Sequence, residues 1–222
     1  LLGLVGSEMC IRDRTYTGAA TLDAGGALNL TGSTVSFGNS LTGDNENLTI
    51  TGNGSFTGAV SSIAALQVTG DATTGSTVSA TSVAFDSNSS LGGNVTATGD
   101  ITLSDGDGVV LTADTELDGD NVTVSSGVSG AFTLTLDGAS SVDVQGAVTT
   151  TNLTTETAAT IDSANIAGDL SVSGGTLTVD TANAVVGGNA DINSQVSVTS
   201  GSLAVTGTSA IGANVTTSTT QS

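Results

Sequence analysis

Residues 28–32 read LNLTG, residues 48–52 read LTITG and residues 66–70 read LQVTG. Each unit holds an aliphatic residue, any residue, a second aliphatic residue, a small or turn-forming residue and a glycine. Weaker forms of the unit continue along the chain. Their glycines, called the repeat glycines below, are Gly32, Gly52, Gly70, Gly99, Gly119, Gly138, Gly168, Gly188 and Gly207. Most are 18–20 residues apart, but every third interval is 29 or 30 residues. This spacing predicts stacked coils of about 20 residues, lengthened by about 10 at every third coil.

The alternation of aliphatic and polar residues within each unit predicts a short strand with one buried face, and glycine supplies the turn or close approach that follows. Strands this short bury enough apolar surface only when coils stack. The sequence therefore predicts an all-β, single-stranded parallel, right-handed β-helix or β-solenoid. Residues two positions before each repeat glycine are expected to form one inward stack. These are Leu30, Ile50, Val68, Ala97, Leu117, Leu136, Ile166, Val186 and Val205.

A tandem of β-sandwich domains is the rival architecture. A shift of 87 residues places Leu30 on Leu117 and Val35 on Val122, and this shift is close to the size of an immunoglobulin-like domain. Such domains usually need a heavier core with Trp or Pro at fixed places, and this chain has neither residue. The shorter period therefore favours the solenoid.

The charge balance excludes several classes of partner. The 222 residues include 21 Asp and Glu against only 2 Lys and Arg. Without a cationic surface the chain is not expected to bind nucleic acid or anionic lipid. It also has no apolar run of about 18 residues, so we expect no membrane insertion by this segment.

The first 14 residues differ in composition from the rest. Glu8–Arg14 reads EMCIRDR, which resembles a translated sequencing adapter, and it contains Cys10 and both arginines of the chain. We expect residues 1–14 to be an artefact and residues 15–222 to be a β-solenoid repeat region from a longer protein.

Candidate chemistry is sparse. The chain has no His, and outside the first 14 residues it has no Cys, Lys or Arg, so a nucleophilic triad is excluded there. Paired carboxylates could in principle hydrolyse glycosides, which leaves a carbohydrate-active β-helix enzyme as the alternative. Such enzymes generally hold substrate with basic and aromatic side chains, which are scarce here. We therefore expect no enzyme and no catalytic or cofactor-binding site.

Aspartates near the turns are the sharpest local feature. Asp105–Asp107 and Asp118–Asp120 resemble fragments of calcium loops, and Asp100 and Asp120 would lie one coil apart, so a weakly held Ca²⁺ is the alternative to no cofactor. The Asn and Asp residues after the repeat glycines are expected to hydrogen-bond their own turn instead, leaving no metal site. Thr-x-Thr pairs are expected to be outer-face hydroxyl stacks, because their column is too broken for an ice-binding surface.

Residues 15–41 (TYTGAATLDAGGALNLTGSTVSFGNSL) and 48–78 (LTITGNGSFTGAVSSIAALQVTGDATTGSTV) resemble the β-strand repeats of bacterial exoproteins of the filamentous-haemagglutinin type. The resemblance continues to about Phe85, and the rest of the chain matches more loosely. It implies a secreted cell-surface rod, outside the bacterial cell, whose role is adhesion, biofilm formation or cell contact. The implied partner is a host, cell or matrix receptor that the sequence does not identify. The acidic surface agrees with a soluble shaft, since like charges keep rods apart. A cation-binding protein of the surface-layer type is a further alternative.

Overall fold

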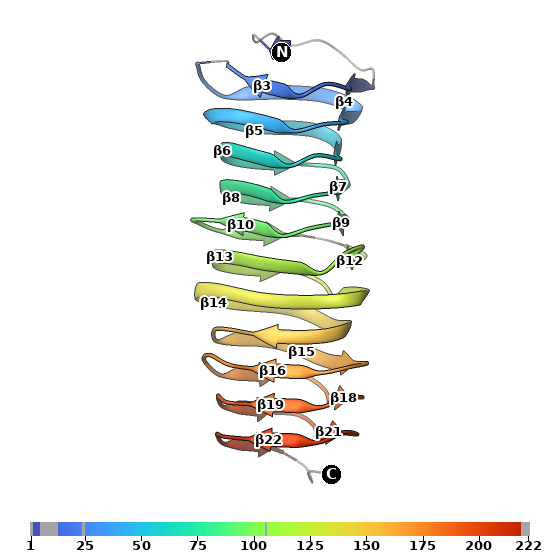
Figure 1. Cartoon of the computed structure of the whole chain (residues 1–222), viewed down its shortest axis with the longest axis vertical. Helices are drawn as coiled ribbons and strands as arrows, with labels where there is room; N and C mark the ends of the chain where they lie inside the picture. Colours follow the sequence, from blue (N-terminus) through green and yellow to red (C-terminus); the bar gives the residue numbers. More distant parts are fainter. Residues whose placement is uncertain (1, 5–12, 24, 105, 219–222) are drawn as a thin grey trace.

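A computed structural model describes residues 2–4, 13–23, 25–104 and 106–218. Figure 1 shows a rod of stacked coils with the N and C termini at opposite ends. The chain makes about eleven turns, roughly 19 residues apart, and every strand pairing among the described residues is parallel. The predicted parallel β-solenoid is therefore confirmed. The tandem β-sandwich is wrong, because its sheets require antiparallel neighbours.

The described residues form strands and turns without a helix. Their strands are β1 (Leu2–Leu4), β2 (Arg14–Tyr16), β3 (Ala20–Leu22), β4 (Leu28–Phe37), β5 (Leu41–Phe56), β6 (Val60–Val68), β7 (Ala72–Thr74), β8 (Val78–Phe85), β9 (Ser89–Leu91), β10 (Val95–Ala97), β11 (Ile101–Leu103), β12 (Val109–Leu111), β13 (Thr115–Val124), β14 (Val128–Thr155), β15 (Ala159–Ile166), β16 (Leu170–Val172), β17 (Leu177–Val179), β18 (Ala184–Val186), β19 (Ala190–Ile192), β20 (Val196–Val198), β21 (Leu203–Val205), β22 (Ser209–Ile211) and β23 (Val215–Thr217). Long strands such as β14 pass around corners of the coil.

Each coil contains three extended stretches, and the register stacks them into three faces. Face I consists of residues 28–30, 48–50, 66–68, 83–85, 101–103, 122–124, 142–144, 159–161, 177–179, 196–198 and 215–217. Face II consists of residues 14–16, 35–37, 54–56, 72–74, 89–91, 109–111, 128–130, 148–150, 164–166, 184–186 and 203–205. Face III begins at residues 2–4 and 20–22 and continues through 95–97, 134–136, 170–172 and 190–192 to 209–211.

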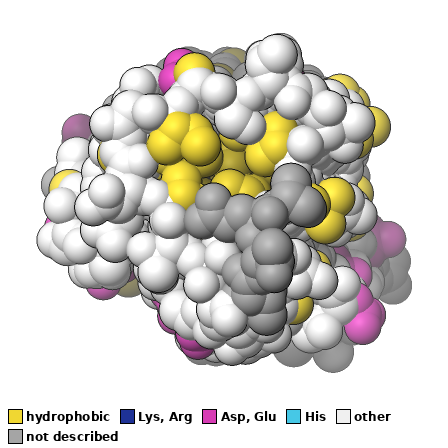
Figure 2. Space-filling view, turned by 90° about the horizontal axis from the view of Figure 1, so that it is seen from below, with side chains coloured by type: hydrophobic (Ala, Val, Ile, Leu, Met, Phe, Trp, Pro, Cys, Tyr) yellow, Lys and Arg dark blue, Asp and Glu magenta, His cyan; other side chains and the backbone are white. Residues whose placement is uncertain are grey.

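The core runs along the inside of all three faces. In most stretches from residue 14 onward the first and third residues point inward and the second points outward, as in the buried–intermediate–buried pattern of β11. Small aliphatic side chains fill most of the interior, and three phenylalanines, Phe37, Phe56 and Phe85, are its largest fully buried side chains. Tyr16, Phe37 and Phe56 stack on successive coils with ring centroids 4.9 and 5.6 Å apart. Seen from the C-terminal end, hydrophobic side chains occupy the centre of the coil (Figure 2).

The prediction of one continuous inward stack is wrong. Leu30, Ile50 and Val68 do stack directly, on face I, but the next residue of that column is Phe85. The motif residues Leu117 and Leu136 lie on face III, whereas Ile166, Val186 and Val205 lie on face II. Over an interval of 29 or 30 residues the chain passes through one full coil and two further faces. The motif therefore moves to a different face, and the coil itself is not lengthened.

A second difference concerns register. Aligning the repeat glycines Gly99 and Gly119 would pair Leu117 with Ala97, but Leu117 pairs with Val95. The register between β10 and β13 is therefore shifted by two residues. All nine predicted stack residues nevertheless point into the interior. Eight are buried, and Val205 is partly buried and packs against the core.

The repeat glycines are required mainly for close approach. Among the nine, Gly52 alone has a positive φ, of 115°. At Gly188 an added Cβ would lie 2.7 Å from the carbonyl carbon of Gly168 on the preceding coil, and at Gly207 it would meet Gly188 in the same way. Backbone amides connect these glycines, since the Gly188 N–H donates to Gly168 O at 2.8 Å. The glycines therefore allow neighbouring corners to touch backbone to backbone.

The predicted boundary at residue 14 is only partly covered by the structure. Residues 8–12 of the adapter-like segment, with Cys10, lie outside the described residues. Arg14 begins β2, and its position pairs with Val35 of β4.

Candidate interaction surface

Asn and Asp side chains after the repeat glycines connect successive coils. The Asp71 N–H donates to Asn53 Oδ1 at 2.9 Å, and the Asn189 N–H donates to Asp169 Oδ1 at 2.7 Å. In both cases donor and acceptor are 18 or 20 residues apart. The prediction that these side chains cap their own turn is therefore wrong. The turns stack so closely that the nearest free amide belongs to the following coil.

One corner carries this arrangement over several coils. Asn152 donates through Nδ2 to Thr133 Oγ1 and accepts the Asp169 N–H at its Oδ1. Asn189 continues the series by accepting both the N–H and the hydroxyl of Thr208 at 3.0 and 2.9 Å. The bonds from the Asp169 and Thr208 N–H groups satisfy turn amides that would otherwise depend on water. We call this series the corner ladder.

Asn189→Ala should reduce the free energy of unfolding by about 1 kcal/mol, because the Thr208 amide and hydroxyl lose their side-chain acceptor. Hydrogen exchange at Thr208 should accelerate more than exchange in central coils. Asn193→Ala is the matched control, since the side-chain Nδ2 of Asn193 donates to Asp191 Oδ1, two residues earlier on the same coil. Equal effects of the two substitutions on Thr208 exchange would contradict this role of the ladder.

The aspartates considered for calcium have protein partners. Asp100 Oδ1 accepts from Asn121 Nδ2 at 2.8 Å, whereas Asp120 Oδ1 accepts from Ser140 Oγ at 2.5 Å. Asp105 lies outside the described residues. Within the described ranges, no group of three or more His, Cys, Asp or Glu is arranged so that it could hold a metal ion. The two carboxylates thus act in the structure as acceptors for neighbouring coils.

A cluster of carboxylates on face III was not singled out by the sequence as a unit. Asp118 stacks on Asp137, and Glu116 and Glu156 lie beside them, with Glu116 and Glu156 both lining a hollow of about 210 Å³. Desolvation by the surrounding protein, followed by repulsion from Asp118, Glu156 and Asp137, raises the pKa of Glu116 above its usual value of 4.5. Asn94 Nδ2 donates to Glu116 Oε2 at 3.0 Å.

Glu116→Gln should stabilise the protein at about pH 7, and the gain should shrink toward about pH 4. A raised pKa means that the folded protein holds this proton more tightly than the unfolded chain. The favourable contribution of the protonated carboxyl is therefore complete below the unfolded pKa and is lost as the pH rises through the folded pKa. Urea titrations at both pH values measure the difference.

Asp143→Asn is the control, because it removes one negative charge from face I, away from the carboxylate cluster. An equal gain from both substitutions at neutral pH would indicate a net-charge effect. No gain from Glu116→Gln at that pH would contradict the repulsion described above.

Threonine side chains next to the repeat glycines partly serve the backbone. Thr31 and Thr51 pair on adjacent coils, as expected for hydroxyl stacking. Thr69 instead accepts the Gly52 N–H at its Oγ1, at 3.1 Å.

Face II differs from the other two faces in its outward side chains. Its outward positions in each coil are all uncharged: Thr15, Ser36, Ser55, Thr73, Ser90, Val110, Ser129, Thr149, Asn165, Val185 and Ala204. The residues two positions further on are Thr, Gly or Ala throughout. Val110 and Val185 are 47% and 42% exposed. By contrast, Asp143 points outward on face I and Asp191 on face III.

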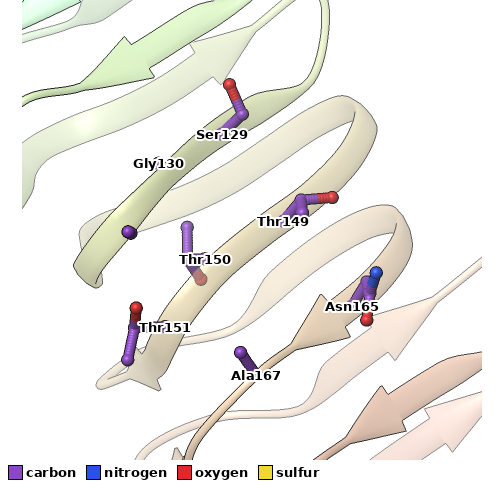
Figure 3. Close-up of a pocket in the computed structure, with 8 residues that line it drawn as sticks. Ser129, Gly130, Thr149, Thr150, Thr151, Asn165 and Ala167 are labelled. Carbon is purple, nitrogen blue, oxygen red and sulfur yellow. The ribbon is translucent and has the colours of Figure 1, made fainter.

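A hollow of about 290 Å³ lies on face II, where Figure 3 shows Ser129, Thr149 and Asn165 on successive coils. It forms because Gly130, Ala131 and Ala167 leave space between the longer side chains. The lining offers hydroxyl and amide groups without a charged side chain. To find face II in the sequence, every extended stretch must first be assigned to one of the three faces. The motif moves from one face to another along the chain, so it does not give this assignment.

The chain matches no protein-family model, and no significant match to it was found among curated proteins or among solved structures. Its described residues include no helix that is long and apolar enough to span a membrane.

Proposed function

We propose that this chain is part of the shaft of a secreted bacterial surface adhesin, with a structural and not a catalytic role. The observation that carries the proposal is the single core that continues through about eleven coils. A rod built in this way keeps its two ends at a fixed distance, because each coil is fixed to the next by three parallel pairings and by corner contacts.

The surface supports the same role. The net charge of −19 disfavours unspecific association and keeps an extended rod soluble. The two described hollows lined by Asn94 and by Ser129 contain no basic or aromatic side chain that would hold an acidic polysaccharide. The resemblance of residues 15–85 to filamentous-haemagglutinin-type exoproteins points to the extracellular surface and to adhesion, biofilm formation or cell contact.

The test is to place the whole chain between an outer-membrane anchor and a nanobody on a laboratory bacterium with long surface polysaccharide. Capture of antigen-coated beads should exceed that of cells carrying a Gly/Ser linker of about 20 residues, because eleven coils at about 4.8 Å hold the nanobody about 50 Å from the anchor, whereas that linker spans only about 25 Å on average. Equal capture would overturn the shaft proposal. A reducing-sugar assay with neutral and acidic polysaccharides tests the alternative, and release of reducing ends would establish an enzyme instead.

A further inference from the structure

We propose that face II is a self-association surface, on which two copies of this chain pack face to face and antiparallel. The inference is independent of the adhesin proposal, since it rests on the distribution of charge and exposed valines around the rod.

Charge is the first argument. Each copy carries a net charge of −19, so most approaches between two copies are repulsive. Face I presents Asp143 and face III presents Asp118 and Asp191, so pairing through either face would bring carboxylates into a desolvated contact. Face II has no acidic residue among its outward positions. It is therefore the face on which a second copy meets the smallest desolvation penalty.

The shape of the face is the second argument. Its outward side chains are Ser, Thr, Ala, Val and Asn, interspersed with glycines, and they stand on a regular parallel sheet. Two such surfaces can approach over their whole length without a large side chain holding them apart. Val110 and Val185 provide exposed apolar area that a partner would remove from water.

The position of Val110 fixes the arrangement. Face II has a stretch in each of eleven coils, from residues 14–16 to residues 203–205, and the stretch of β12 is the sixth. Antiparallel pairing about a two-fold axis through this central stretch brings the whole of both faces into contact. On that axis Val110 of one copy meets Val110 of the other. Any other axis position leaves part of the face uncovered.

The area is sufficient for a specific but modest dimer. Eleven stretches at about 4.8 Å, each about four residues wide, cover roughly 50 Å by 13 Å. The interface then buries about 650 Å² per copy, or about 1,300 Å² in total, at the lower end of the range for specific complexes. Acidic residues at the edges, such as Asp107 and Asp114, should weaken the dimer at low salt.

Sedimentation equilibrium of the full chain, at about 0.05 M and about 0.5 M NaCl, tests the proposal. We expect a monomer–dimer equilibrium that strengthens with salt. Val110→Asp should raise the dissociation constant at least about tenfold at either salt concentration, because two like charges would meet on the axis.

Thr102→Asp is the matched control. Thr102 is the outward middle residue of β11 on face I, just as Val110 is of β12, so both variants add one charge between two buried neighbours. Circular dichroism verifies that both variants fold, and Val185→Asp provides a second face II variant if Val110→Asp does not. A wild-type chain that sediments as a monomer at both salt concentrations would overturn the proposal. Equal weakening by the Thr102 and face II variants would do so too.

Discussion

Phe85→Ala is expected to lower the free energy of unfolding by about 3–5 kcal/mol, the largest loss among the substitutions considered. Phe85 is fully buried on face I, between Val68 of the preceding coil and Leu103 of the next. Because both neighbours are held by backbone pairing, the coils cannot collapse into the space that the ring leaves. Urea unfolding followed by circular dichroism measures the loss.

Phe132→Ala is the control for this experiment. Phe132 lies in β14 but is only partly buried against the core, so its removal should cost clearly less than removal of Phe85. If both substitutions cost the same, the continuous core of face I would not be the main source of stability.

Gly188→Ala is expected to destabilise the protein by about 1–3 kcal/mol although it adds only one methyl group. The added Cβ would lie 2.7 Å from the carbonyl carbon and oxygen of Gly168, and backbone atoms held between two coils cannot move aside. Thermal unfolding should show a lower midpoint and an earlier loss of the coils around residue 188.

Gly26→Ala provides the comparison, because a Cβ at Gly26 would meet nothing within 4 Å and its φ is not positive. This variant should be as stable as the wild-type chain or slightly more stable. Comparable destabilisation at both sites would mean that loss of backbone freedom, and not contact between coils, explains the glycine repeat.

Much of the fold could be predicted from the LNLTG-type unit, because a glycine every 18–20 residues and alternation within each unit leave few alternatives to stacked parallel strands. The burial of residues such as Leu30 and Leu136 follows from the same alternation. What the pattern did not contain was the number of faces. Without it, the 29-residue step from Gly70 to Gly99 suggested a longer coil, whereas the structure has a change of face.

The surface was less predictable for the same reason. The side chains of Asn53 and Asp169 were expected to hydrogen-bond their own turns, but they accept from Asp71 and Asn189 on the next coil, a contact that depends on register and not on local sequence. Face II likewise becomes visible only when Val110, Thr149 and Val185 are placed in one column. Successive residues of this column are about 19 positions apart in the sequence, and Asp residues lie between them. The uncharged column is therefore not visible in the linear sequence.

The uniform distance along the chain between paired strands also bears on how quickly the protein can fold. Partners are roughly 19 residues apart in a chain of 222, which gives a relative contact order of about 0.09. Values in this range are typical of helical bundles, and all-β proteins usually have about twice as much. This molecule should therefore fold rapidly for a sheet protein, adding one turn after another as the polypeptide emerges, without waiting for its distant end.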